Sequence, residues 1–421
     1  MIETIHLLPG VTLRVCRDTR FKQGCLSVQF VRKMDKQEAA LNALLPNVLL
    51  RGTRRFPDLQ AITERLDELY GAAVGPSVRR SGDYQTTGLY CGFIDDRFAM
   101  AGDRIVEPVI GFLEELLLDP AMETGRFLPS FVESEKRNLI STIESERNDK
   151  RSYAISQLLR TMSGEDTFGL PRLGDPEQVE AIDPDGLYRH YQKVLRQSPI
   201  EIFYVGSAES REVEGMIMPL LRHLDREPEP LPPQTGFHPG KGGDTVETMD
   251  LAQGKLCMGF VTPITNRSPE FPAMQVLNTI FGSGMTSKLF LNIREKMSLC
   301  YSVSSMYYGS KGVAVVTAGI DFDKEELTRR EVLNQLQACR EGKISDEELA
   351  AGKAALISSL RAVHDSPGSI ESYYAAAALS GLNYTHENYM AAVERVTLAD
   401  VRAAARQLTL HTTYFLRGES Q

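Results

Sequence analysis

Tryptophan is absent from this chain of 421 residues, and cysteine is scarce. The six cysteines lie far apart in the sequence, and none of them forms a C-x-x-C pair. Small secreted proteins that depend on disulfides show dense, regularly spaced cysteines, which this chain does not have. The pattern argues against a disulfide framework and favours a reduced protein of the cytoplasm.

Long apolar runs and basic blocks are also missing. The longest apolar stretches, such as residues 112–118, fall well short of the ~20 residues that span a membrane. Residues 1–10 lack the pattern of a signal peptide. The formal net charge is −9, and no basic stripe is present that could neutralise phosphates. We expect no membrane partner, no nucleic-acid partner and a cytoplasmic location.

A segment rich in proline and glycine divides the chain near its middle. It runs from Asp225 to Gly243, with prolines in its first part and glycines at its end. Such a composition is typical of a linker between domains. Because the chain is also too long for one ordinary core, we predict a first domain over residues 1–226, a linker over residues 227–243 and a second domain over residues 244–421.

The two halves show the same order of strands and helices. Alternating patterns predict strands at residues 11–15, 26–31, 72–80, 84–94 and 200–206, and again at 255–262, 301–308, 313–320 and 412–416. Helical patterns lie at residues 36–51, 58–69, 105–118 and 131–162, and again at 269–280, 287–296, 324–341 and 346–363. The repetition indicates an internal duplication. It predicts an α+β fold of two homologous halves, each a mixed or antiparallel sheet with helices on one face, which face each other around a chamber.

Several motifs of the chain resemble those of the pitrilysin-type zinc peptidases, or inverzincins. The first half supplies Leu45-Pro46, then Leu49 to Thr53 and the run LDELYGA at residues 66–72. The second half supplies residues 282–290, then Ile293 to Lys296 and the run LCYSV at residues 299–303. The resemblance covers nearly the whole chain. It implies similarity to the small bacterial members, which resemble the mitochondrial processing peptidase in pairing a catalytic chain with a partner that lacks the catalytic motif.

The motif H-x-x-E-H of these enzymes is missing where the resemblance places it. Residues four apart on a helix share one face, so two histidines there can hold one zinc ion while the glutamate between them activates water. Here Ala43 and Asn47 stand at the two ligand positions, and Pro46 stands at that of the glutamate. We therefore predict a degenerate metal site that holds no metal in this chain.

The distant third ligand of the family maps to Glu133. A simpler interpretation of this residue is a charged side chain on the solvated side of a long helix, paired with Lys136 one turn later. We favour this structural role. The carboxylates farther along the same helix are expected to be solvated and receive no catalytic role.

Arg294 and Tyr301 are present where the resemblance implies contacts with substrate. An arginine can hold a peptide carbonyl or carboxylate, and a tyrosine hydroxyl can donate to a developing oxyanion. Their alternative roles are a helix-end ion pair for Arg294 and a half-buried strand aromatic for Tyr301. With the family resemblance in view, we predict that both bind substrate.

The leading hypothesis is a non-catalytic subunit of a heterodimeric zinc peptidase. A catalytic chain of the same family would supply the zinc, and this chain would supply half the chamber and contacts to an unfolded peptide. Strand addition to a sheet edge could hold that peptide. The alternatives are a peptide-binding or scaffold protein without peptidase activity, and a self-sufficient hydrolase with an unrecognised site, which the sequence disfavours. The isolated chain could also form a homodimer.

Overall fold

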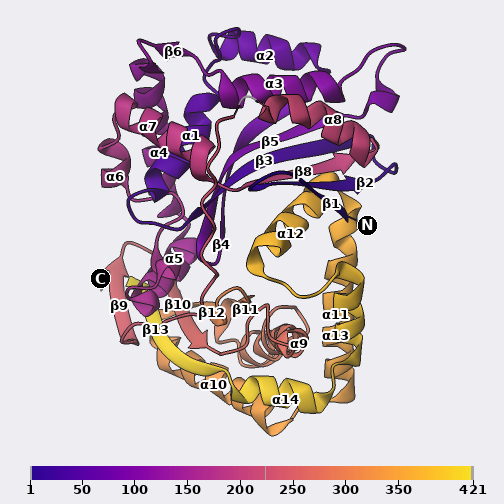
Figure 1. The fold of residues 1–421 in the computed structure, drawn as a ribbon. Helices are drawn as coiled ribbons and strands as arrows, with labels where there is room; N and C mark the ends of the chain where they lie inside the picture. The colour runs from indigo at the N-terminus through magenta and orange to yellow at the C-terminus, as the bar shows by residue number, and fades with distance from the viewer. Residues whose placement is uncertain (1, 223, 419–421) are drawn as a thin grey trace. The chain divides into compact units, whose positions relative to one another are not determined.

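The computed structural model describes residues 2–222 and 224–418, which form two compact units (Figure 1). Unit 1 comprises Met1–Glu144, Pro171–Pro233 and His364–Leu379, and unit 2 comprises Ser145–Leu170, Gln234–Val363 and Ser380–Gln421. Each unit therefore takes one segment from the opposite half of the chain. The segment that joins unit 1 carries helix α12 (Pro367–Ser380), and the segment that joins unit 2 carries helix α5 (Lys150–Ser163).

Unit 1 is built on a six-stranded mixed sheet in the order β1-β2-β8-β3-β5-β4. Only β2 and β8 run parallel, and the other neighbours are antiparallel. The strands are β1 (Ile2–Leu8), β2 (Val11–Arg17), β3 (Gln23–Lys33), β4 (Ala73–Ser81), β5 (Tyr84–Ile94) and β8 (Ile200–Gly206). A short hairpin of β6 (Met122–Glu123) and β7 (Arg126–Phe127) stands apart from this sheet.

Both faces of this sheet are covered, by helices from different parts of the chain. Alternate residues of β3 point to opposite faces, and its even-numbered apolar side chains, Leu26 to Phe30, pack into the main core with the first-half helices. The opposite face contacts Ile370 of α12 through Cys16, Cys25 and Val205. The first-half helices are α1 (Ala39–Leu49), α2 (Leu59–Glu68), α3 (Val106–Leu118), α4 (Pro129–Glu146), α6 (Pro176–Glu180), α7 (Pro184–Gln197) and α8 (Ser210–Leu221).

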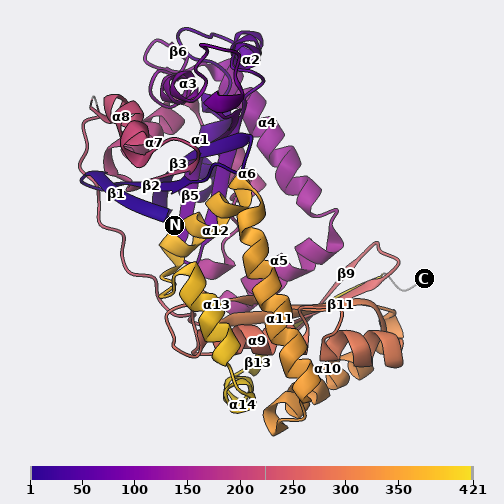
Figure 2. The same ribbon diagram turned by 90° about the vertical axis from the view of Figure 1, so that its right-hand side faces the viewer.

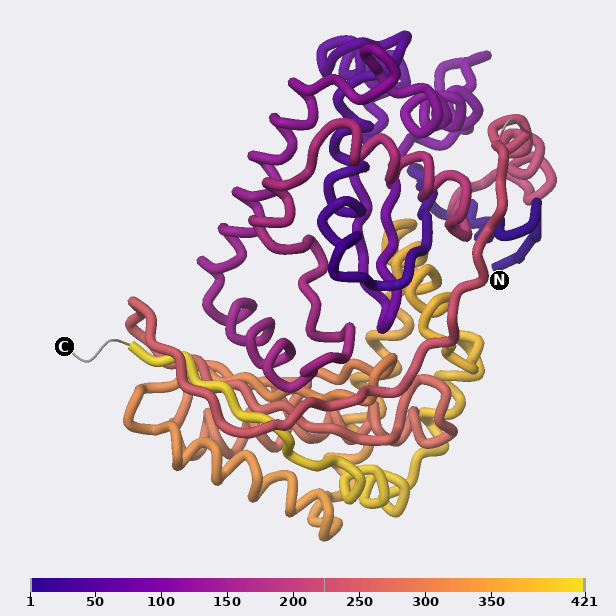
Figure 3. Tube along the Cα trace, turned by 60° about the vertical axis from the view of Figure 1, so that its left-hand side comes forward, coloured from indigo at the N-terminus to yellow at the C-terminus, as the bar shows by residue number. Residues whose placement is uncertain are grey.

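Unit 2 repeats this plan with a five-stranded sheet in the order β11-β12-β10-β13-β9. Its strands are β9 (Gly243–Met249), β10 (Gly254–Val261), β11 (Cys300–Tyr308), β12 (Val313–Ile320) and β13 (Thr409–Gly418). Residues 227–242 form an irregular connection from α8 to β9, which the trace in Figure 3 follows. The predicted α+β class, with a mixed sheet in each half, is confirmed.

Helices cover both faces of the second sheet as well. Helix α5 packs its Ala154, Leu158 and Met162 against one face, formed by β10, β12 and β13. Helix α9 (Phe271–Phe281) packs against β11 and contacts the remaining helices, which Figure 2 shows from the side. They are α10 (Glu325–Glu341), α11 (Asp346–Ala362), α13 (His386–Arg395) and α14 (Leu398–Arg406). Among the residues that the structure describes, no helix is long and apolar enough to cross a membrane.

The prediction of a single helix over residues 131–162 is wrong, because the structure has two helices there, α4 and α5. The carboxylate of Asp149 accepts the backbone N–H groups of Arg151 and Ser152 and so begins a new helix. The boundary between the compact units lies nearby, between Glu144 and Ser145 in the last turn of α4. The helical pattern in the sequence is continuous, so it does not reveal that the chain leaves the core of unit 1 and enters that of unit 2 in this region.

A buried carboxylate fastens α12 to the sheet of unit 1. Glu371 has no exposed surface, and Arg79 of β4 donates to its two oxygens at 3.0 and 2.8 Å. Ser27 and Gln29 of β3 donate to the same carboxylate at 2.6 and 3.0 Å. A fifth donor, the Ser372 hydroxyl of α12, lies 3.4 Å from the carboxylate. These donors compensate the desolvated charge, so the loss of this charge would leave Arg79 unpaired against the sheet.

We expect Glu371→Gln to lower the stability of the protein by about 3 kcal/mol, because it removes one partner of a buried ion pair. Urea denaturation followed by circular dichroism measures the effect. Glu180→Gln, at an exposed position of α6, is the matched control and should leave the denaturation midpoint unchanged. Equal midpoints for Glu371→Gln and the unmodified chain would show that the ion pair does not hold α12.

Candidate functional site

Helix α1 carries Ala43 and Asn47, where the sequence resemblance places the histidines, and it continues through a proline. Pro46 has no N–H, so the carbonyl oxygen of Asn42 loses its donor within the helix. The hydroxyl of Thr87 on β5 donates to that oxygen at 2.6 Å. Strand β5 thereby replaces the missing hydrogen bond, and the helix extends to Leu49.

A buried polar network holds the same helix to its neighbours. The Asn42 amide donates to Gln85 Oε1 at 2.8 Å, and its oxygen lies 2.8 Å from His190 Nε2. Gln85 in turn donates to the backbone oxygen of Ala39 at 3.1 Å. Burial lowers the pKa of His190 to about 4, so its imidazole is neutral at neutral pH and donates through Nε2.

Ala43 and Asn47 lie together on the wall of a cavity of about 340 Å³ in unit 1. The Asn47 amide turns back onto its own helix and donates to the backbone oxygen of Ala43 at 2.9 Å. Ala43 offers only a methyl group. Pro46 does not line this cavity, because it packs among Phe30 and Tyr191 on the apolar side of α1.

Glu133 and Glu135 lie on different sides of α4. The Glu133 side chain is 49% exposed and accepts from Lys136 Nζ at 3.0 Å, which confirms the predicted pair within the helix. Glu135 lines the cavity beside Asn47. Its carboxylate pairs with Arg51, 3.3 Å from Nη1, and accepts a hydrogen bond from the Asn138 amide. The sequence did not single out Glu135, because its place depends on how α4 is rotated against α1.

The residues around this cavity do not fit a zinc ion. Zinc sites use thiolate, imidazole or carboxylate ligands in close groups, and the one carboxylate on the wall is committed to Arg51 and Asn138. Across residues 2–222 and 224–418, no cluster of three or more His, Cys, Asp or Glu could hold a metal ion. No step of a zinc mechanism can be assigned to these side chains.

Strand β4 forms the edge of the sheet beside the same cavity, and two of its outward positions are blocked. A proline within a sheet turns its nitrogen away from the neighbouring strand, so Pro76 faces the free edge without a donor. Val78, two residues later, faces the same edge, and its carbonyl oxygen accepts from Arg172 at 3.0 Å. An added peptide strand would lose a pairing partner at each position.

Arg294 lies in unit 2 on a π-helical segment, η3 (Leu289–Lys296). Its guanidinium lies over the ring of Phe290, 4.7 Å from the centroid, and 3.6 Å from the carboxylate of Glu295. Segments of π-helix are rare and are found often at functional sites. The stacking on Phe290 orients the guanidinium while its N–H groups remain available at the surface.

Tyr301 lies at a β-bulge near the start of the edge strand β11. The pairing with β12 passes from Cys300 opposite Ile320 to Ser302 opposite Gly319, so Tyr301 is the extra residue. A bulge redirects the side chain of the inserted residue, and Tyr301 is 62% exposed instead of half-buried. This high exposure excludes the half-buried strand role for Tyr301.

Asp321 and Lys324 hold the tyrosine hydroxyl in place. Tyr301 donates to Asp321 Oδ1 at 3.0 Å, and Lys324 Nζ lies 2.6 Å from Asp321 Oδ2. The hydrogen bond to Asp321 raises the pKa of Tyr301, while Lys324 and Tyr301 lower the pKa of Asp321. The phenol therefore keeps its proton at neutral pH.

The structure brings Arg294 and Tyr301 together, because both line one cavity of about 350 Å³ in unit 2. Lys324 lines the same cavity. In the sequence, Asp321 follows Ile320 at the end of a strand, as Asp95 follows Ile94 in the first half. The two aspartates have different partners, because Asp95 forms an ion pair with Arg97 at 2.7 Å. The arrangement offers a cation and a protonated phenol to one ligand.

Comparisons with known proteins show what this chain is similar to. Residues 181–356 match the family model described as the peptidase M16 inactive domain. A Bacillus subtilis (strain 168) protein named probable inactive metalloprotease YmfF is 29% identical over 409 residues, 97% of this chain and 96% of that protein. A Streptomyces coelicolor protein named uncharacterized zinc protease SCO5738 is 25% identical over 374 residues, 86% of this chain and 77% of that protein.

Two solved structures share the fold. The crystal structure of a conserved protein from Enterococcus faecalis V583 aligns with a TM-score of 0.91 and 28% identity, covering 100% of this chain and 99% of the other. A peptidase M16 inactive domain from Pseudomonas fluorescens aligns with a TM-score of 0.81 and 18% identity, covering 100% and 98%, a likeness of fold alone.

The fold and the relatives together indicate a non-catalytic, peptidase-like protein. It is similar to proteins of the peptidase M16 type, among them one named as a probable inactive metalloprotease. The predicted resemblance is thereby confirmed.

The low pKa of His190 makes the stability of unit 1 depend on pH. Its ordinary value is 6.5 and its value in the folded chain is about 4, so the unfolded chain binds a proton over this interval that the folded chain does not. Stability is therefore full above pH 6.5 and falls as the pH drops toward 4, by about 3 kcal/mol.

Urea titrations at pH 7, 5.5 and 4.5 measure this slope. His190→Gln keeps a donor for Asn42 and should flatten the dependence, whereas His6→Gln at an exposed position should retain it. The same slope in His190→Gln and the unmodified protein would assign the acid sensitivity to other groups.

Proposed function

We propose that this chain is the non-catalytic subunit of a heterodimeric zinc peptidase of the cytoplasm. The observation that carries the proposal is the cavity shared by Arg294 and Tyr301, retained in a chain whose Ala43 and Asn47 cannot bind zinc. A catalytic chain of the same family would supply the zinc and the glutamate that activates water. This chain would supply one part of the peptide chamber, and when isolated it could pair with a second copy of itself.

Arg294 and Tyr301 would act on the peptide bound to the partner's active site. The guanidinium, already oriented by Phe290, would hold a carbonyl or carboxylate of the peptide. The Tyr301 hydroxyl would turn from Asp321 to the oxyanion that develops during hydrolysis. Lys324 would keep Asp321 compensated while the tyrosine is engaged.

The substrates would be unfolded peptides. Because Pro76 and Arg172 interrupt the free edge of β4, pairing of the substrate strand would fall to the catalytic partner. The contribution of unit 1 would then be to recognise other parts of the peptide.

We expect the isolated chain to take up well under one zinc ion per chain in equilibrium dialysis followed by atomic absorption. The variant Ala43→His with Asn47→His places two imidazoles on one helical face beside the cavity and should gain zinc. Stoichiometric zinc in the unmodified chain, together with peptide cleavage by that chain alone, would contradict the proposal.

We expect a mixture of this chain with a catalytic relative from the same organism, one that carries H-x-x-E-H, to cleave a quenched fluorescent peptide. Tyr301→Phe removes an oxyanion donor and should lower kcat by about 100-fold. Arg294→Ala removes a charged hydrogen bond and should lower kcat/KM by about tenfold.

The matched controls are Tyr384→Phe and Arg330→Ala, which lie in unit 2 away from the cavity and should leave turnover unchanged. If the Tyr301 and Arg294 variants also leave turnover unchanged, this chain does not assist catalysis. A role as a peptide-binding scaffold would then replace the proposed one.

A further inference from the structure

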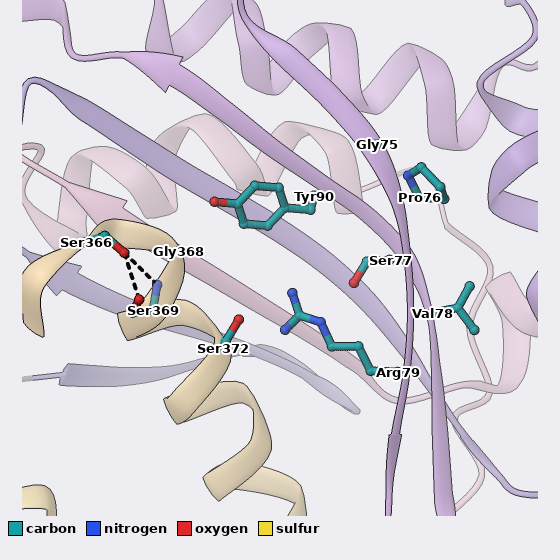
Figure 4. A pocket seen from close by; sticks show the side chains of 10 residues that line it. All are labelled: Gly75, Pro76, Ser77, Val78, Arg79, Tyr90, Ser366, Gly368, Ser369 and Ser372. Atoms are coloured by element: carbon teal, nitrogen blue, oxygen red, sulfur yellow. Dashed lines mark hydrogen bonds between the residues drawn. The ribbon is translucent and has the colours of Figure 1, made fainter. Parts of the chain in front are cut away.

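A second cavity of unit 1, of about 630 Å³, lies between β4 and the first turn of α12. This volume is within the range of sites for small organic ligands. Figure 4 shows Ser77 and Arg79 of β4 and Tyr90 of β5 projecting toward the start of α12. The helix contributes three serines to the wall, Ser366, Ser369 and Ser372. None of these residues belongs to the degenerate metal positions or to the cavity of unit 2.

Ser77 is a buried donor without a partner. Its residue is 6% exposed, and its hydroxyl oxygen makes no hydrogen bond in the described structure. Buried hydroxyl groups are nearly always paired, and an orphan one costs free energy until a ligand or water satisfies it. The hydroxyl of Ser77 is directed into the cavity, so a ligand there can complete it.

Arg79 presents further donors to the same space. Two of its five N–H groups hold Glu371, and the side chain remains 33% exposed. Glu371 itself is saturated by its donors, which include the Ser372 hydroxyl at 3.4 Å, and it is not part of the cavity wall. The guanidinium therefore offers its remaining N–H groups to the cavity, while no carboxylate on the wall competes for them.

The first turn of α12 adds backbone donors at the positive end of its dipole. Ser366 caps the helix by accepting the N–H of Ser369 at 3.1 Å. The N–H of Gly368 belongs to the same turn, where helices leave backbone donors open. A Cβ at Gly368 would lie 3.2 Å from the Tyr90 hydroxyl, so a bulky side chain there would crowd this approach to the cavity.

We propose that this cavity binds the C-terminal carboxylate of a peptide. Donors of several kinds converge on it: the Ser77 hydroxyl, the Arg79 guanidinium and the first turn of α12. A carboxylate can accept from all of them, and the volume leaves space for the last residues of a peptide, which an inorganic anion would leave empty. The inference deepens the proposed function and rests on it for the choice of a peptide over another organic carboxylate.

The test uses the isolated full-length chain and fluorescence anisotropy. The probe is a library of random pentapeptides, labelled with fluorescein at the N-terminus and ending in a free carboxylate. The second probe is the same library ending in a C-terminal amide. We expect the free acids to bind about tenfold more tightly than the amides, because one charge-assisted hydrogen bond is lost.

Ser77→Ala should weaken binding of the free acids about tenfold without lowering the thermal unfolding midpoint, because the hydroxyl makes no bond within the protein that the substitution could remove. Gly368→Val, which fills the approach beside Tyr90, should also weaken it. Ser141→Ala, an exposed serine of α4, is the control and should leave binding unchanged.

Equal affinity for acids and amides would overturn the proposal, as would unchanged affinity in Ser77→Ala. Displacement of the free acids by inorganic phosphate at equal concentration would assign the cavity to a free anion instead of a peptide end. Binding is measured without a catalytic partner, so it can fail while the reconstituted peptidase still depends on Arg294 and Tyr301. It can equally succeed when that dependence is absent.

Discussion

The buried carboxylate of Glu371 is the contact on which the arrangement of unit 1 depends. It lies in a helix from the second half of the chain, and four donors from β3 and β4 meet it on the sheet. A desolvated charge is tolerable only with such complete compensation. The same arginine that neutralises Glu371 also faces the cavity with its remaining N–H groups, so the anchoring of α12 and the chemistry of the cavity share one side chain.

The candidate sites of the two units differ in the side chains that they present. In unit 1 the positions of the zinc ligands carry a methyl group and an amide that bonds to its own helix, and the sheet edge beside them is interrupted by Pro76 and Arg172. In unit 2 a π-helical turn and a β-bulge still present Arg294 and Tyr301 to one cavity.

The sequence predicts the strands well because their side chains alternate between two buried faces. The ranges 84–94, 200–206 and 313–320 coincide with β5, β8 and β12. The sequence does not predict features whose place in the structure depends on contacts between distant segments of the chain. The helical pattern of residues 131–162 gives no sign that Asp149 starts a helix belonging to the other core. Likewise, helical spacing alone cannot tell which of Glu133 and Glu135 faces α1, and the bulge at Tyr301 follows from the register with β12.

The exchange of α5 and α12 has a consequence for how the gene for this protein can be divided. The linker at residues 227–243 marks a natural point to separate the two halves of the sequence, but neither product would contain a complete core. The N-terminal fragment would expose the sheet face that Ile370 and Glu371 cover, and it would carry α5 without its apolar seat on β10 and β13. The two fragments would complement each other as a split protein, because each carries the helix that covers the exposed sheet of the other.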